Sequence, residues 1–317
     1  MHNFSKGNST MSKPQLRVIA FPGAPNLPTF TAIEHNQFSQ RGFDVDLELT
    51  PSSIYQAEQT SAGNFDIICT AFDNVVAYGS GQGAAKIGTS PDYVVIMGAT
   101  QLELSLIVAP EIKTVADLAG KTIALDALTT GFAFVLFDML EAAGLGQSDV
   151  EFVAVGATPQ RWQSVQDGTH AATLLIEPFT SIAQFGGFNV IAKSTDMYAE
   201  YQGGVIATTR KTLQNEPEKV EAFIGAYLNG LGWVLDPANR EGAESILSSR
   251  MPQIKPKAMT AVMRSLTSPK SGLTPSANLL DKGMEKVIEL RSKYGCGATP
   301  IGSAGDFLDL KLYKQIV

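Results

Sequence analysis

The chain has little of what metal and thiol chemistry require. Its 317 residues include only 2 cysteines and 3 histidines, and no two of these stand at the spacing of a metal site. Cys69 lies inside an apolar run, which favours a buried strand over a nucleophile. Cys296 is far away in sequence, and a disulfide between the two cysteines stays open. We therefore expect no metal site and no cofactor.

Charge and long apolar runs are also scarce. Charged residues make up 17% of the chain, and the net charge of -7 gives nucleic acid and anionic membranes no electrostatic reason to bind. No apolar run reaches the roughly 18 residues that cross a bilayer. Residues 1–15 are polar and lack the apolar core of a secretory leader, so we expect a disordered N-terminal segment. These absences point to an acidic protein that acts on small molecules and does not span a membrane.

Apolar strand patterns alternate with helical patterns from residue 16 onward. We predict short helices over 29–38, from Ser53 to Gly63 with Gln56 completing a capping box, and from Asp73 to Gly79. Strands are predicted over 16–21, 43–50 and 65–71. Such alternation with short turns predicts a mainly parallel sheet flanked by helices.

A second α/β unit follows. After a helix led by Thr114 and Asp117, strands are predicted over 121–126, 150–155 and 173–176. Apolar strand-like runs border this unit at 104–108 and 204–207, which indicates two chain crossings between two lobes. We therefore predict a discontinuous first lobe, residues 16–106 plus 205–317, with a second lobe, residues 107–204, inserted into it.

The C-terminal third has helical patterns. One apolar stripe runs from Pro217 to Asp236, and a later helix is predicted to open near Ser276. Both stripes are predicted to pack into the core of the first lobe and complete it.

The most informative segment is the strand at 121–126, which leads through Thr129 and Thr130 to Gly131, where a new helix begins. The first N–H groups of a helix have no intrahelical partner and carry partial positive charge. This junction can therefore hold a carboxylate, sulfonate or phosphate without a basic side chain. Alternatively, Thr129 is only the N-cap of the helix.

Several short motifs occur in a characteristic order. They are RGFDVDLE at 41–48, AGNFDI at 62–67, VADLAGKTI at 115–123, QDGTHAA at 166–172 and EPF at 177–179. In this order, over residues 16 to about 290, the chain resembles the periplasmic substrate-binding proteins of the nitrate, sulfonate and taurine type. The resemblance implies an α/β, type II periplasmic-binding-protein-like fold, in which two lobes joined by two crossing segments close on one solute.

The resemblance also implies which loops face the cleft. Asp73 and Asn74 have a competing role as helix caps, and Phe72 and Tyr201 could hold a planar ligand between them. Arg161 is the one basic residue close to a predicted turn of the second lobe, where it could contact an anion. The alternative, which a single residue of this kind favours, is a solvated arginine at the start of a helix. The expected ligand-binding residues are Ala24, Asn26, Thr70, Phe72, Asp73, Asn74, Thr129, Thr130, Gly131, Phe132, Arg161, Glu177 and Tyr201.

By this resemblance, the protein is expected to bind a small anionic or heteroaromatic ligand and deliver it to an ABC permease, as a monomer. That role implies a periplasmic location, although the visible sequence carries no secretory leader and a cytoplasmic location stays open. The alternative is an enzyme on the same fold, either an aromatic-acid decarboxylase or lyase or a pyrimidine-precursor synthase, with Asp73, Glu177 or His170 as its acid or base. A sensor module is a third possibility. No catalytic residue is assigned, and the enzyme reading is the less favoured.

Overall fold

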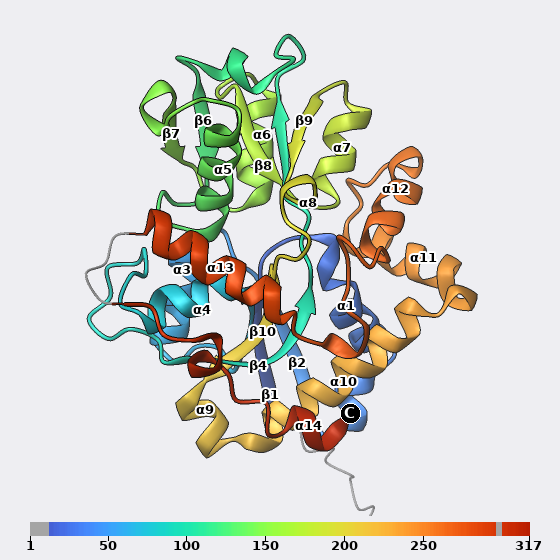
Figure 1. Ribbon diagram of the computed structural model, residues 1–317. Coiled ribbons are helices and arrows are strands. Elements are labelled where there is room, and N and C mark those ends of the chain that lie inside the picture. The colour runs from blue at the N-terminus through green and yellow to red at the C-terminus, as the bar shows by residue number, and fades with distance from the viewer. Residues whose placement is uncertain (1–12, 296–299) are drawn as a thin grey trace, which may run out of the picture.

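The computed structural model describes residues 13–295 and 300–317, so most of the polar segment at 1–15 and Cys296 lie outside the described residues. Two five-stranded sheets form its framework, in the orders β2-β1-β3-β10-β4 and β7-β6-β8-β5-β9 (Figure 1). The first sheet contains β1 (Gln15–Ala20), β2 (Asp44–Leu49), β3 (Ile67–Ala71), β4 (Tyr93–Thr100) and β10 (Gly204–Thr209). The second contains β5 (Ser105–Val108), β6 (Thr122–Leu125), β7 (Glu151–Ala154), β8 (Ala172–Leu175) and β9 (Asn189–Lys193).

Each sheet is parallel except for one strand. β10 runs antiparallel to both β3 and β4, and β5 runs antiparallel to both β8 and β9. These are the strands that receive the chain after it passes from one sheet to the other, through 101–104 and through 198–203. The mainly parallel α/β prediction is confirmed, but β4 and β9 were not predicted. β4 is buried along its whole length, so no alternation of polar residues marks it.

Helices cover both faces of the first sheet, and we call this assembly lobe I. Figure 1 shows α3, α4 and α13 to one side and α1, α10 and α11 to the other. The helices of lobe I are α1 (Leu27–Glu34), α2 (Gln37–Gln40), α3 (Ser53–Ser61), α4 (Phe72–Gly79), α9 (Arg210–Asn215), α10 (Pro217–Leu235), α11 (Arg240–Arg250), α12 (Pro256–Leu266), α13 (Asp281–Tyr294) and α14 (Tyr313–Ile316). The apolar stripe predicted for α10 is buried against α1.

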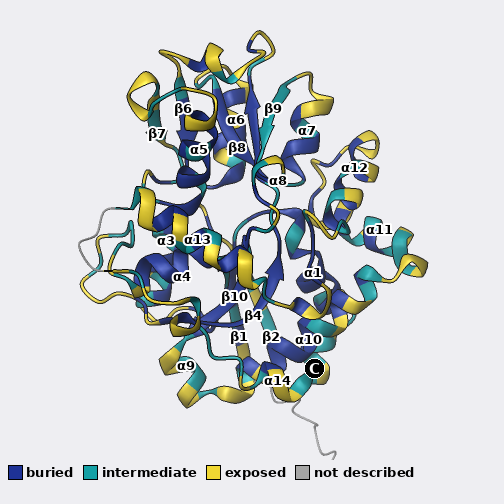
Figure 2. Cartoon of the chain, viewed as in Figure 1, coloured by how far each residue is buried: buried dark blue, intermediate teal, exposed yellow. Residues whose placement is uncertain are grey.

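Shorter helices surround the second sheet, which with them forms lobe II. They are α5 (Gly131–Ala142), α6 (Thr158–Gln166), α7 (Phe179–Phe185) and α8 (Ser194–Met197). The helix expected after Thr114 is a single 3-10 turn, Val115–Leu118, which Thr114 and Asp117 cap. Figure 2 shows buried residues gathered around both sheets and exposed ones on the outer faces of the helices. No helix within 13–295 or 300–317 is long and apolar enough to cross a membrane.

Three predicted helix starts are corrected by the structure. Ser52, not Ser53, caps α3, because its Oγ accepts the N–H of Tyr55 at 3.1 Å. Asp73 does not cap α4 but lies in its first turn, where its carboxylate binds a distant arginine. Ser276 has φ 54, which ends a 3-10 turn, so the last long helix begins only at Asp281. The local sequence indicated that each helix exists. It did not show which polar side chain caps the helix and which one makes a tertiary contact instead.

The sequence predicted that α13 completes the first lobe, but α13 also contacts the second lobe. It packs against α4 of lobe I and also against α5 of lobe II. Near its C-terminal end, Lys293 Nζ and Tyr294 Oη reach the carboxylate of Asp138, at 2.9 and 3.0 Å. The C-terminal segment therefore links the two lobes along one side, as a strap between them (Figure 1).

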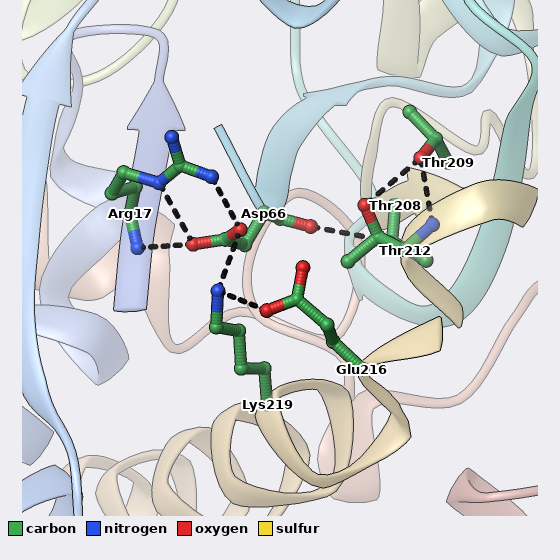
Figure 3. Close-up of polar contacts among 7 residues, drawn as sticks. All are labelled: Arg17, Asp66, Thr208, Thr209, Thr212, Glu216 and Lys219. Carbon is green, nitrogen blue, oxygen red and sulfur yellow. Dashed lines mark hydrogen bonds and ion pairs between the residues drawn. The ribbon is translucent and has the colours of Figure 1, made fainter. Parts of the chain in front are cut away.

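An ion-pair cluster around the buried carboxylate of Asp66 connects β1, the start of β3, β10 and α10 (Figure 3). The Asp66 carboxylate accepts hydrogen bonds from Arg17 Nη2 at 2.8 Å and Lys219 Nζ at 3.1 Å. Its backbone oxygen accepts Thr208 Oγ1 at 2.7 Å. Burial alone would raise the pKa of Asp66, but the hydrogen bonds from Arg17 and Lys219 outweigh it and lower that pKa. Because every charge has a partner, we interpret this cluster as structural.

Candidate functional site

A cleft of about 850 Å³, measured with the part open to solvent, lies between the carboxyl ends of the two sheets. Lobe I contributes residues from the ends of β1, β3 and β4, from the start of β10, and from α1 and α4. Lobe II contributes the turn after β6, the first residues of α5 and part of α6. Ligands of open α/β sheets bind at such strand ends, so this cleft is the candidate site.

The expected ligand-binding residues divide into two groups. One group lines the cleft: Asn26, Thr70, Asn74, Thr130, Gly131, Phe132 and Arg161. The other group lies around it without lining it: Ala24, Phe72, Asp73, Thr129, Glu177 and Tyr201. Residues of the second group hold the walls together, as the following contacts show.

Asp73 connects the lobes beside the cleft. Its Oδ1 accepts Arg291 Nε at 2.7 Å, and its Oδ2 accepts Arg291 Nη2 at 2.5 Å. The same Oδ2 accepts the N–H of Gly131 across the cleft at 2.6 Å, while Arg291 Nη2 also donates to the Thr129 carbonyl at 3.0 Å. Both side chains of the pair are buried. The carboxylate of Asp73 is thus the hydrogen-bond acceptor for the first N–H group of α5, that of Gly131.

The following amides of α5 remain open. Among the residues that the structure describes, the N–H groups of Phe132 and Ala133 donate to no protein acceptor. Thr130, not Thr129 as the alternative from the sequence had it, is the N-cap by position. Its Oγ1 donates to the Ala127 carbonyl at 3.2 Å and caps no amide. The strand-to-helix junction singled out from the sequence therefore has two free amides, those of Phe132 and Ala133. They lie at the part of the cleft wall that Gly131 and Phe132 form.

Arg161 is the cation of the cleft wall. It comes from α6 and is 3% exposed. Its guanidinium donates four hydrogen bonds to uncharged oxygens, those of Thr173 Oγ1, Gly156 O, Thr158 Oγ1 and Leu174 O, at 3.2, 2.8, 3.3 and 3.1 Å. No carboxylate in the described ranges lies within ion-pair distance of it. Burial lowers the pKa of Arg161 to about 10, which leaves it charged at neutral pH.

Asp126 lines the cleft, although it was not among the expected ligand-binding residues. It follows β6, and its carboxylate accepts the N–H of Ser53 from lobe I at 3.1 and 3.3 Å. Asp126 also acts on Arg161 through space and opposes the lowering of that pKa. An acidic residue directly after a buried strand was the available signal, because parallel strands end at the ligand side of the sheet.

Most other missed lining residues are apolar or small. They include Phe21, Ala71, Leu102, Ile176, Val205 and Ile206, together with Thr29, Cys69, Thr158 and Tyr227. Burial raises the pKa of the Cys69 thiol to about 12, so this thiol is neutral and a weak nucleophile. These residues are indistinguishable from core residues in the sequence, because only the fold decides which buried positions border a cleft.

Backbone contacts close the cleft from both sides. The N–H of Ala24 donates to the Glu177 carbonyl at 3.0 Å, and the N–H of Ala157 donates to the Pro51 carbonyl at 2.8 Å. The Glu177 carboxylate accepts Ser181 Oγ at 2.9 Å, and burial raises the pKa of this carboxyl. Together with the hydrogen bond from Gly131 of lobe II to Asp73 of lobe I, these bonds show that the two lobes are in a closed arrangement.

The two aromatic side chains that could hold a planar ligand are engaged elsewhere. Phe72 meets Phe307 edge to face, with ring centroids 6.4 Å apart. Tyr201 stacks on Tyr198, with centroids 6.1 Å apart. The aromatic ring on the cleft wall next to the open amides is that of Phe132.

Comparisons with known proteins agree with this architecture. A family model described as NMT1/THI5 like matches residues 25–240. Among curated proteins, no sequence matches significantly. The alkanesulfonate-binding protein SsuA from Xanthomonas axonopodis pv. citri, bound to MOPS, has a TM-score of 0.73 at 16% identity, over 95% of this chain and 99% of that one.

Two further solved structures extend the likeness. The periplasmic nitrate-binding protein NrtA from Synechocystis PCC 6803 has a TM-score of 0.80 at 11% identity, over 96% of this chain and 88% of that one. A conserved Candida albicans gene product with the generic periplasmic binding protein fold has a TM-score of 0.73 at 13% identity, over 93% and 96% of the two chains. The predicted periplasmic-binding-protein-like fold is confirmed.

Proposed function

Because the chain belongs to the NMT1/THI5-like family, we propose that it is a solute-binding protein that closes two lobes on a small organic anion and delivers it to an ABC-type transporter. The observation that carries this proposal is Arg161, a buried cation on the cleft wall whose hydrogen bonds all go to uncharged oxygens. The Asp126 carboxylate acts on Arg161 only through space and forms no direct ion pair with it. A buried cation without a direct ion-pair partner is costly, and a bound anion would supply that partner.

The open amides of α5 support an anion in the same way. Phe132 and Ala133 offer N–H groups at the positive end of a helix of 12 residues. Together with Arg161, the amide of Phe132 gives lobe II a cation and a backbone donor on the same cleft, with the amide of Ala133 next in the helix. A carboxylate or sulfonate suits this combination, because each of its oxygens accepts more than one hydrogen bond.

The body of the ligand is proposed to be apolar. Phe21, Leu102 and Phe132 border the cleft together with Ile176, Val205 and Ile206. Aliphatic or aromatic groups gain free energy when such a surface buries them. An inorganic anion alone would leave this surface without a partner.

Transport also fits two of the structural neighbours, an alkanesulfonate-binding protein and a periplasmic nitrate-binding protein. We propose that the moving bodies are lobe I and lobe II, with the hinge at the crossings 101–104 and 198–203. The lobe boundaries expected from the sequence, 106/107 and 204/205, would cut β5 and β10, so they move to these crossings. We further propose that the protein acts as a monomer in the periplasm, where it meets an ABC permease.

The enzyme alternative has less support from the site. Asp73 is fixed in its ion pair with Arg291, and Glu177 directs its carboxylate at Ser181. His170 lies on a turn, where its Nδ1 is 3.3 Å from Thr122 Oγ1, and it does not line the cleft. None of these three side chains borders the space that a substrate would fill, as a general acid or base must.

Isothermal titration calorimetry with matched anionic and neutral probes tests the proposal. We expect binding of benzoate or benzenesulfonate by the wild-type protein and at least about tenfold weaker binding of benzamide and benzenesulfonamide, which lack the charge. The substitution Arg161→Gln should remove most of the difference, whereas Arg210→Gln, an exposed arginine outside the cleft, should keep it. Equal affinity of the wild-type protein for each charged probe and its neutral partner would overturn the proposal, whatever the variants show.

A further inference from the structure

Two residues with buried hydroxyl groups border the lobe I side of the cleft. Thr29, from α1, and Tyr227, from α10, both border the cleft, and each residue is 1% exposed. Neither Thr29 Oγ1 nor Tyr227 Oη has a hydrogen-bond partner among the residues that the structure describes. A buried hydroxyl without a partner is destabilising, so a group from outside the chain is expected to pair with it.

These two residues lie in the lobe opposite to the anion-binding features. Arg161 and the open amides of α5 belong to lobe II, whereas Thr29 and Tyr227 belong to helices of lobe I. The apolar residues Leu102, Ile176 and Val205 border the same cleft. A ligand that fills the cleft would therefore present one end to each lobe.

The charges on the cleft wall restrict the chemistry of the second end. Its charged lining residues are Asp126 and Arg161, and both belong to lobe II. The lining residues that lobe I contributes are uncharged, and they include Cys69 and Asn26, whose Nδ2 donates to the Phe21 carbonyl at 2.7 Å. A second ionised group at this end would be buried without a counter-ion, so the group is neutral.

We propose that Thr29 and Tyr227 form a specificity subsite for a neutral hydrogen-bonding group, such as a hydroxyl, at the end of the ligand opposite its acid. This inference rests on the proposed function, since it extends the same anion-binding cleft. It narrows the ligand class to monoanions with an apolar body and a distal hydroxyl, amide or carbonyl.

The test compares probes that differ by a single hydroxyl. Calorimetry on the full chain would use benzoate with 4-hydroxybenzoate, benzenesulfonate with 4-hydroxybenzenesulfonate, and hexanoate with 6-hydroxyhexanoate. In at least one pair we expect the hydroxylated probe to bind about tenfold tighter or more, because polar groups left unpaired in a site reject ligands that lack the matching group. Terephthalate, which places a second charge at that end, should bind more weakly than benzoate.

Matched variants assign the preference to the two side chains. Tyr227→Phe and Thr29→Val remove only the hydroxyls and should each reduce the preference to less than about threefold. The control is Thr31→Val, because Thr31 lies on the same helix, is equally buried and lacks a partner, but does not line the cleft. That variant should retain the preference of the wild-type protein.

The possible outcomes separate this inference from the proposed function. If the anions bind and require Arg161, but no hydroxyl improves affinity or the preference survives both variants, the subsite is wrong and the proposed function stands. Ordered water on the two hydroxyls would give that result. If charged and neutral probes bind alike, or no anion binds, the proposed function fails and the subsite fails with it.

Discussion

Arg291 of α13 holds both carboxylate oxygens of Asp73, at 2.7 and 2.5 Å, and the same carboxylate accepts the Gly131 amide of the opposite lobe at 2.6 Å. The two partners are 218 positions apart in the sequence. Together they place a buried ion pair at the edge of the proposed ligand site and connect lobe I, the strap helix α13 and the start of α5. Closure of the cleft and stability of the fold therefore depend on shared contacts.

Breaking this pair should destabilise the protein. In Asp73→Asn the Arg291 guanidinium stays buried without its counter-charge, and such a change costs about 3–5 kcal/mol of unfolding free energy. Urea denaturation of the variant and the wild-type protein measures the loss. A cost below about 1 kcal/mol would mean that Arg291 reaches solvent or another anion.

Gly131→Ala should hinder closure of the cleft. A Cβ at this position would lie 2.6 Å from Asp73 Cβ, so the lobes must move apart. If only a tenth of the molecules can then close, the affinity for an anion falls about tenfold. Calorimetry measures the affinity, and small-angle X-ray scattering should show a larger radius of gyration. Gly232→Ala is the control, because its Cβ would contact nothing within 4 Å; unchanged affinity in both variants would contradict the closed geometry.

Asp66 should make stability depend on acid pH. Its pKa is lowered below the model-peptide value of 3.8, so its contribution is present above that pH and is lost as the pH falls through the folded-state pKa. We expect the free energy of unfolding to fall below pH 3.8, and Asp66→Asn to remove part of that fall while costing about 3 kcal/mol at pH 7. Urea titrations from pH 3 to pH 7 measure both effects. An unchanged acid profile in the variant would assign the fall to other groups.

Cys69 should resist alkylation in the folded protein. Burial raises the pKa of its thiol to about 12, so only about one molecule in ten thousand carries the thiolate at pH 8. In a Cys296→Ser background, mass spectrometry should detect little modification by iodoacetamide until denaturant is added. Rapid alkylation without denaturant would show that the thiol is accessible and ionised.

Patterns that are local in the sequence predicted much of the fold. The strand ends around Thr70 and Gly131 and the long stripe of α10 follow from apolar periodicity and turn residues, and they lie as expected. β4 was not predicted, although its sequence YVVIMGAT is an apolar run of the same kind as that of β1. Periodicity records which side of an element is buried but not which element covers it.

The site could be predicted only where it follows directly from a strand end. Asn26 and Thr130, in the turns after β1 and β6, line the cleft. Arg161 lies inside α6, and its burial contradicts the solvated arginine that the sequence favoured. The ion pair of Asp73 with Arg291 has no local signal, because it joins residues that only the folded chain brings together. Tyr227 reads as one more core position of α10, and its place on the cleft wall depends on how α10 crosses lobe I.

A crystal structure with bound 4-bromobenzenesulfonate tests the central claim most directly, because the anomalous signal of bromine locates the anion independently of its contacts. The account predicts one molecule between the lobes, with its sulfonate at hydrogen-bond distance from the amides of Phe132 or Ala133 and on the side of Arg161. An anion bound outside this cleft, or bound there with its sulfonate directed at Tyr227, would contradict the account.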